Sequence, residues 1–192
     1  EVRSPSRTFV TDSAGNVAYY EAGLMGTTVH FDVIGHGYVA TSADLLADEG
    51  DTATIQVTRV NIAERLYRVT GGGIYRDSVL LDEATPVAAP LINRQVFGQD
   101  STLTAVYQNK IFWIWGDTTG PATHNFSVSA AVSDTPGQGG LDPSIGVDYR
   151  YFTEASGRVK AMLPLPRKGL VWIEGLFTVR DPQGQERLLA TY

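Results

Sequence analysis

Near its middle the chain reads Leu103-Thr-Ala-Val-Tyr-Gln-Asn-Lys-Ile-Phe-Trp-Ile-Trp115, two apolar runs joined at Gln108-Asn-Lys110. This pattern predicts a strand, a turn and a second strand, that is, a β-hairpin. Side chains alternate across a strand, so Trp113 and Trp115 are expected on one face. Aromatic residues dominate β cores, so that face is more often core than ligand platform.

A similar layout recurs towards the end of the chain. Trp172-Ile-Glu-Gly-Leu-Phe-Thr-Val179 leads through a turn at 180–184 to Glu186-Arg-Leu-Leu-Ala-Thr-Tyr192. Asp100 and Glu174 each stand just before one of these strand–turn–strand units. We also expect strands at 125–132, 149–152 and 158–162. Repeated four-stranded units predict blades of a β-propeller. A closed propeller needs at least about four blades, so we expect the chain to be a fragment of a longer protein.

The first 62 residues show a different β pattern. Val29, Phe31 and Val33 alternate with polar residues, as in a strand with one buried face. Further strands are expected at 7–11, 16–20 and 52–61, which together predict a small β-sandwich. The fold is therefore predicted to be all-β, with three parts: a sandwich at 1–62, a linker at 63–98, and the first two blades of a propeller at 99–192.

Composition excludes several classes of protein. The 192 residues include no cysteine, which rules out disulfides and thiolate chemistry. The net charge of −6 disfavours a nucleic-acid partner. Without an apolar run of about 18 residues, no membrane-spanning helix is expected. The start of the chain, Glu1-Val-Arg-Ser-Pro5, lacks the apolar stretch of a signal peptide.

Several motifs carry a family resemblance. They are Ala63-Glu-Arg-Leu-Tyr-Arg-Val-Thr-Gly-Gly-Gly-Ile-Tyr-Arg-Asp-Ser-Val-Leu-Leu81, Gly98-Gln-Asp-Ser101, Phe112-Trp-Ile-Trp-Gly-Asp-Thr118 and Gly139-Gly-Leu-Asp-Pro143. Together they resemble a group of bacterial secreted proteins from planctomycete- and acidobacteria-like genomes. The resemblance implies a secreted, periplasmic or cell-envelope location. It also implies a transthyretin-like (prealbumin-like) or carboxypeptidase-regulatory-like module, followed by a five-bladed propeller similar to glycoside hydrolases of the arabinanase, fructosidase and mannoside-phosphorylase type.

The same resemblance implies acidic site residues, with the general base on the first blade and a general acid on a later blade that these 192 residues would not include. In such propellers, acidic residues at the starts of innermost strands surround a central funnel, and Asp100 and Glu174 occupy the matching positions here. The resemblance thus makes Asp100 the general base. Our own hypothesis adds Glu174 as the acid or as a group that modulates pKa values, because cleavage needs two carboxyl groups. Glu174 lies in an apolar stretch, and such surroundings would raise the pKa of a carboxyl group. The alternatives are that Asp100 caps backbone N–H groups and that Glu174 is an ordinary surface residue of a strand.

Other residues are candidates for substrate contact. Trp172 and Tyr75 are expected to contact sugar. Asp117 is either a site residue or a turn carboxylate bonded to its own backbone. His124 and Asn125 could donate hydrogen bonds from the funnel wall.

No metal or other cofactor is predicted. The histidines lack zinc-site spacing. The one alternative is calcium at Asp134, Asp142 and Asp148, whose spacing does not match a calcium-binding loop.

The function expected from these residues is carbohydrate-active, namely cleavage of a glycosidic bond by paired carboxylates. The alternative is a non-catalytic module that binds glycan or protein, because a propeller does not fix an activity. A third reading makes the sandwich an adhesion or spacer module. We expect the 192 residues alone to lack glycosidase activity and to self-associate, because two blades leave open sheet edges.

Overall fold

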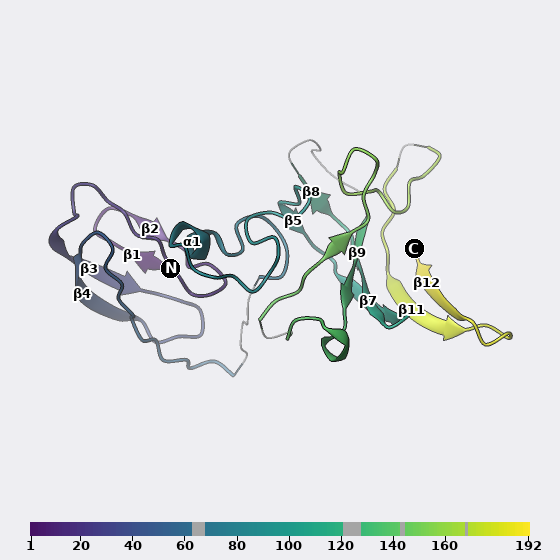
Figure 1. Ribbon diagram of the computed structural model, residues 1–192, viewed down its shortest axis with the longest axis horizontal. Helices are drawn as coiled ribbons and strands as arrows, with labels where there is room; N and C mark the ends of the chain where they lie inside the picture. Colours follow the sequence, from purple (N-terminus) through teal and green to yellow (C-terminus); the bar gives the residue numbers. More distant parts are fainter. Residues whose placement is uncertain (63–67, 121–127, 143–144, 168) are drawn as a thin grey trace. The chain divides into compact units, whose positions relative to one another are not determined.

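The computed structural model describes residues 1–62, 68–120, 128–142, 145–167 and 169–192, and strands dominate it (Figure 1). The chain divides into two compact units. The first comprises Glu1–Leu66 and Tyr75–Ala84, and the second comprises Tyr67–Ile74 and Thr85–Tyr192. The all-β character predicted from the sequence is therefore confirmed. The described part of segment 63–98, which we expected to be a linker, is divided between the two units.

Four antiparallel strands form the sheet of the first unit, in the order β2-β1-β3-β4. They are β1 (Val2–Arg3), β2 (Thr8–Phe9), β3 (Thr27–Val33) and β4 (Thr41–Ala47). Strands β3 and β4 pair along their whole length (Figure 1). The predicted alternation of β3 buries Val29 and Phe31, which form a small core with Ala47. Tyr19 lies edge-on to Phe31 in the same core.

A short helix, α1 (Arg76–Leu80), belongs to the first unit, and the carboxylate of Asp12 makes two of the hydrogen bonds that join it to the N-terminal segment. Asp12 Oδ2 accepts hydrogen bonds from the Ser78 N–H (2.7 Å) and the Ser78 hydroxyl (2.6 Å). Asp12 Oδ1 accepts from the N–H groups of Ala14 (2.9 Å) and Asn16 (3.1 Å). Partial burial by itself would raise the pKa of Asp12, but these hydrogen bonds outweigh it and lower the pKa.

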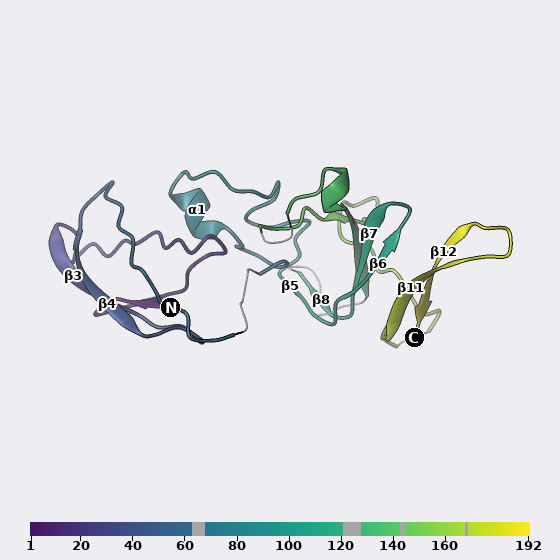
Figure 2. The same cartoon turned by 90° about the horizontal axis from the view of Figure 1, so that it is seen from below.

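The second unit contains a four-stranded antiparallel sheet of order β10-β9-β7-β6. Its strands are β6 (Leu103–Tyr107), β7 (Lys110–Trp115), β9 (Ser129–Asp134) and β10 (Arg150–Tyr151). Figure 2 labels β6 and β7, which lie next to each other. Between β6 and β7, Gln108 and Asn109 both have positive φ (50° and 60°). Two such residues make the type I′ turn that suits tight hairpins. The hairpin predicted from residues 103–115 is confirmed.

The two faces of this sheet carry different side chains. On one face Trp113 and Trp115 stack with ring centroids 6.2 Å apart, and Tyr149 lies edge-on to both. The other face carries Ile114 and its apolar neighbours on β6, β7 and β9. Trp113 and Trp115 therefore share a face, as the alternation predicted, and that face is core, since Trp115 is 1% exposed.

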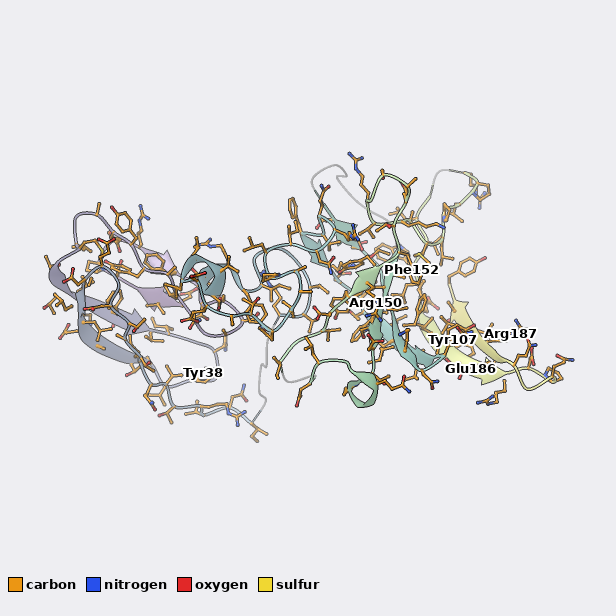
Figure 3. All side chains as sticks on the ribbon, viewed as in Figure 1. Tyr38, Tyr107, Arg150, Phe152, Glu186 and Arg187 are labelled. Atoms are coloured by element: carbon orange, nitrogen blue, oxygen red, sulfur yellow. The ribbon has the colours of Figure 1, made fainter. Side chains whose placement is uncertain are left out.

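A second hairpin follows at the end of the chain. Strands β11 (Gly175–Arg180) and β12 (Glu186–Thr191) pair along their whole length, around the turn expected at 180–184. The hairpin lies against β6, where the Thr178 hydroxyl donates to the Val106 carbonyl (2.7 Å). Figure 3 shows Tyr107 and Glu186 close together, and the adjacent Gln108 N–H donates to Glu186 Oε2 (2.6 Å).

Some expected strands are absent from the structure. Residues 16–20 are irregular, and segment 52–61 contributes only an isolated bridge between Arg59 and Tyr38. Segment 158–162 likewise forms only the bridge Thr153–Val159. These predictions were wrong because alternation shows only that a sequence can form a strand. A strand forms only where another segment pairs with it in the right register.

We expect the stability of the first unit to depend on pH through His30, an exposed residue of β3. His30 Nδ1 lies 2.7 Å from Asp44 Oδ1, and His30 Nε2 lies 3.5 Å from Asp32 Oδ1. The hydrogen bond with Asp44 is the main cause that raises the pKa of His30. We therefore expect Asp44→Asn to lower the His30 pKa more than Asp32→Asn does, as measured by NMR titration of the ring protons.

The sign of the stability effect follows from the direction of this shift. Since folding raises the His30 pKa above its unfolded value of about 6.5, the stabilisation is complete below that pH. It is lost as the pH rises through the folded-state pKa. Equal titration shifts in the two aspartate variants would contradict the assignment of Asp44 as the main partner.

Candidate functional site

The hairpin of β6 and β7 continues beyond the four-stranded sheet. Strand β5 (Gly98–Gln99) precedes β6 and pairs with β8 (Thr118–Thr119), which follows β7. Gln99 pairs with Thr118 on one side of the interruption, and Leu103 pairs with Ile114 on the other side. Leu103 is four residues after Gln99, and Ile114 is four residues before Thr118. The register is therefore the same on both sides of the segment that interrupts the ladder.

That interruption places two aspartates next to each other in the backbone. The Asp100 N–H donates to the Asp117 carbonyl, and the Gly116 N–H donates to the Asp100 carbonyl, both at 3.1 Å. Ser101, the next residue, has a φ of 52°, which is uncommon outside glycine. Irregularities of this kind in a β ladder bend a strand and redirect its side chains, and they are common next to functional sites.

Trp172 packs against this irregular segment. An added Cβ at Gly116 would lie 3.3 Å from Cζ3 of Trp172 and 3.0 Å from Cβ of Ser101. The absence of a side chain at residue 116 thus lets the indole lie against the backbone. The Trp172 side chain nevertheless remains 51% exposed, so part of the aromatic ring is open to solvent.

Glu174 lies on the same exposed side as Trp172. The Glu174 N–H donates to the Thr191 carbonyl (3.0 Å), which extends the β11–β12 pairing backwards along the chain. Exposure alternates here, since Trp172 and Glu174 are exposed whereas Ile173 packs into the apolar cluster around Ile114. Residues two apart in an extended segment share a face.

The second unit therefore gathers part of the set predicted from the sequence. Asp100 and Asp117 meet through their backbones, Trp172 lies against Gly116 directly before Asp117, and Glu174 is two residues after Trp172. The side chains of all three acidic residues are exposed. Glu174 therefore lacks the apolar burial expected from its neighbours in the sequence.

Other predicted residues lie elsewhere. Tyr75 belongs to the first unit and is only 4% exposed, so its ring does not offer an open surface to a sugar. His124 and Asn125 lie outside the described residues. The sequence reasoning missed Ser101 and Gly116. The sequence signal that could have revealed them is Gly116, a glycine directly after the aromatic strand that ends at Trp115.

The aspartates considered for calcium are engaged in other interactions. Asp134 accepts hydrogen bonds from Lys110 Nζ (2.6 Å) and Arg150 Nη1 (2.8 Å), with Arg150 labelled in Figure 3. These hydrogen bonds lower the pKa of Asp134 to about 2, and the bond from Arg150 makes the largest contribution. Asp148 Oδ1 accepts from the Ala88 N–H (2.8 Å). Within the described ranges, no group of three histidine or acidic side chains is arranged to hold a metal ion.

The fold and the site define an all-β protein with an exposed indole beside acidic residues. Comparison of the chain with protein-family models, curated proteins and solved structures finds no match. Over the same described ranges, no helix has the length and apolar character needed to cross a membrane.

Proposed function

We propose that the second unit binds carbohydrate on the surface formed by Trp172, Asp100, Asp117 and Glu174. The observation that carries this proposal is the position of Trp172, whose ring is supported by Gly116 and is still half exposed. The electron-rich face of an indole attracts the C–H groups of a sugar ring. Carboxylates beside it can accept hydrogen bonds from sugar hydroxyls.

The exposure of the acidic residues favours binding over cleavage. Hydrolysis needs one protonated and one ionised carboxyl group on either side of the glycosidic bond. Enzymes usually obtain the protonated group by burying it. Asp100 and Glu174 are exposed, which suits hydroxyl recognition better than acid catalysis. Cleavage with Asp100 as base and Glu174 as acid is therefore the second candidate, and the order of strands is what supports it.

That strand order suits a propeller blade. Strands β6, β7, β9 and β10 form a four-stranded antiparallel meander, which is the arrangement of a blade. Asp100 stands before the first of these strands, and Glu174 stands before β11. In this proposal β11 and β12 begin the next blade, and the first unit is a prealbumin-like sandwich. The whole protein would be a secreted or cell-envelope protein.

Binding is tested with soluble arabinan, fructan and mannan, by affinity electrophoresis and by titration of tryptophan fluorescence. Trp172→Ala is expected to weaken binding roughly tenfold or more, because a central tryptophan dominates such contacts. Phe177→Ala is the matched control, since Phe177 is an exposed aromatic residue (43%) of the same unit. Wild-type affinity in Trp172→Ala, or no binding to any of these polysaccharides, would refute the proposal.

The same samples separate binding from cleavage. If the protein releases reducing ends from a polysaccharide, Asp100→Asn should abolish the release and leave the melting temperature nearly unchanged. A lower melting temperature instead would identify Asp100 as a structural residue of the ladder. Binding without release of reducing ends selects the non-catalytic function.

A further inference from the structure

Gln99 and Thr118, the neighbours of the two aspartates, lie on the opposite face of the sheet from the one that regular strand alternation predicts. Trp115 and Ser129 are directly opposite each other, so they share the aromatic face of the sheet. In a regular strand Thr118, three residues after Trp115, would point to the other face. The Thr118 hydroxyl instead lies 2.5 Å from the Ser129 hydroxyl. The alternation of this strand therefore shifts by one residue between Trp115 and Thr118.

The partner strand makes the same shift. Leu103 packs with Ile114 on the apolar face opposite the tryptophans. Gln99, four residues earlier, should share that face in a regular strand. Gln99 Nε2 instead donates to the Ser129 hydroxyl (2.8 Å), on the aromatic face. Because both strands shift together, the register is kept, and the irregularity is confined to residues 100–102 and 115–117.

Four side chains hold this shifted arrangement together. The Tyr151 hydroxyl donates to Gln99 Oε1 at 2.8 Å, and Gln99 Nε2 also lies 3.4 Å from the Thr118 hydroxyl. Ser129 is 2% exposed, and the Tyr151 ring packs against Trp115 with centroids 5.6 Å apart. Burial raises the pKa of Tyr151, so this hydroxyl stays protonated and remains a donor. Ser129 is buried and the other three residues are partly buried, and polar groups that satisfy one another away from water fix a single local geometry.

We propose that Gln99, Thr118, Ser129 and Tyr151 form a clamp that fixes the irregular segment and thereby positions Asp100 and Asp117. Gln99 directly precedes Asp100, and Thr118 directly follows Asp117, so each clamped side chain fixes the backbone next to one aspartate. Gln99 and Tyr151 are positioning residues in this sense. The effect on ligand affinity rests on the proposed carbohydrate site, whereas the effect on the backbone does not.

Two variants test the clamp in the full chain. Gln99→Met keeps the length of the side chain and removes its hydrogen bonds, and Tyr151→Phe keeps the ring and removes one donor. We expect amide hydrogen exchange at Asp100 and Gly116 to be about tenfold faster in Gln99→Met and about threefold faster in Tyr151→Phe. Exchange at Val106 and Ile111, near the other end of the hairpin, should be unchanged. Affinity for the polysaccharide that binds best should fall in the same order.

Ser133→Ala is the matched control. Ser133 is a buried serine of β9 that accepts a hydrogen bond from Trp113 Nε1 (2.8 Å), on the same face as Ser129 but away from the aspartates. It should leave exchange at Asp100 and Gly116 unaltered. The clamp is overturned if Gln99→Met leaves that exchange unchanged, or if exchange accelerates equally along the whole hairpin. If the wild type binds no polysaccharide, the proposed function fails, and the exchange measurement still decides whether the clamp exists.

Discussion

Trp115→Ala is expected to destabilise the second unit by about 3–5 kcal/mol, the largest effect of any substitution considered for this protein. The side chain is 1% exposed, and its ring lies 5.2 Å from that of Tyr149 and 5.6 Å from that of Tyr151, centroid to centroid. Removing the indole leaves a cavity that the neighbouring rings cannot fill, because they stand on β10 or directly before it and are held in place by the sheet.

Urea unfolding followed by tryptophan fluorescence measures this effect, because all three tryptophans belong to the second unit. Trp113 and Trp172 remain as reporters in the variant. Trp172→Ala serves as the exposed comparison and should cost less than about 1 kcal/mol. Trp115→Phe should cost far less than Trp115→Ala, since it keeps an aromatic ring, and the indole Nε1–H of Trp115 has no hydrogen-bond partner among the described residues. Equal losses for the alanine variants at 115 and 172 would contradict the assigned core.

Asp12→Ala is expected to destabilise the first unit by about 2–3 kcal/mol. Asp12 accepts four hydrogen bonds, two of them from Ser78 of α1. Without this carboxylate, the Ser78 N–H and the turn at Ala14 and Asn16 lose an ionised acceptor. The helix then loses its main polar attachment to residues 12–16.

The effect of Asp12 should depend on pH. The folded state lowers the pKa of Asp12, so its stabilisation is complete above the unfolded value of about 3.9. It is lost as the pH falls through the folded-state pKa. The stability difference between wild type and Asp12→Ala should therefore shrink as the solution is acidified below pH about 4.

Amide hydrogen exchange at Ser78 and Leu81 reports on the first unit, which contains no tryptophan. Tryptophan fluorescence of the second unit should be unchanged by Asp12→Ala. Asp51→Ala is the control, because Asp51 is an exposed aspartate of the same unit whose side chain has no hydrogen bond among the residues described. A loss as large in Asp51→Ala as in Asp12→Ala would show that the attachment of α1 contributes little.

Local sequence determined the β class and the clearest hairpins. The apolar runs 103–107 and 111–115 lie on both sides of a short turn, so they carry their own pairing partner and register. The same holds for β11 and β12. Val29 and Phe31 could be assigned to a core because their alternation is regular. In each case the information lies within about 20 residues of the chain.

Long-range contacts decided the features that the sequence did not reveal. Strand β4 reads Thr-Ser-Ala-Asp-Leu-Leu-Ala, without clear alternation, and is a strand because β3 pairs with it. Helix α1 is too short to form alone and depends on Asp12, which is distant in the chain. The approach of Trp172 to Gly116 likewise joins segments far apart in sequence.

The sequence alone thus identified the acidic and aromatic residues and the strands that carry them. Only the tertiary structure placed Trp172 over Gly116, buried Tyr75 in the first unit and shifted the faces of Gln99 and Thr118. The physical reason is that a side chain's chemistry and its strand periodicity are local properties. Exposure and hydrogen-bond partners depend on which distant segment packs against it.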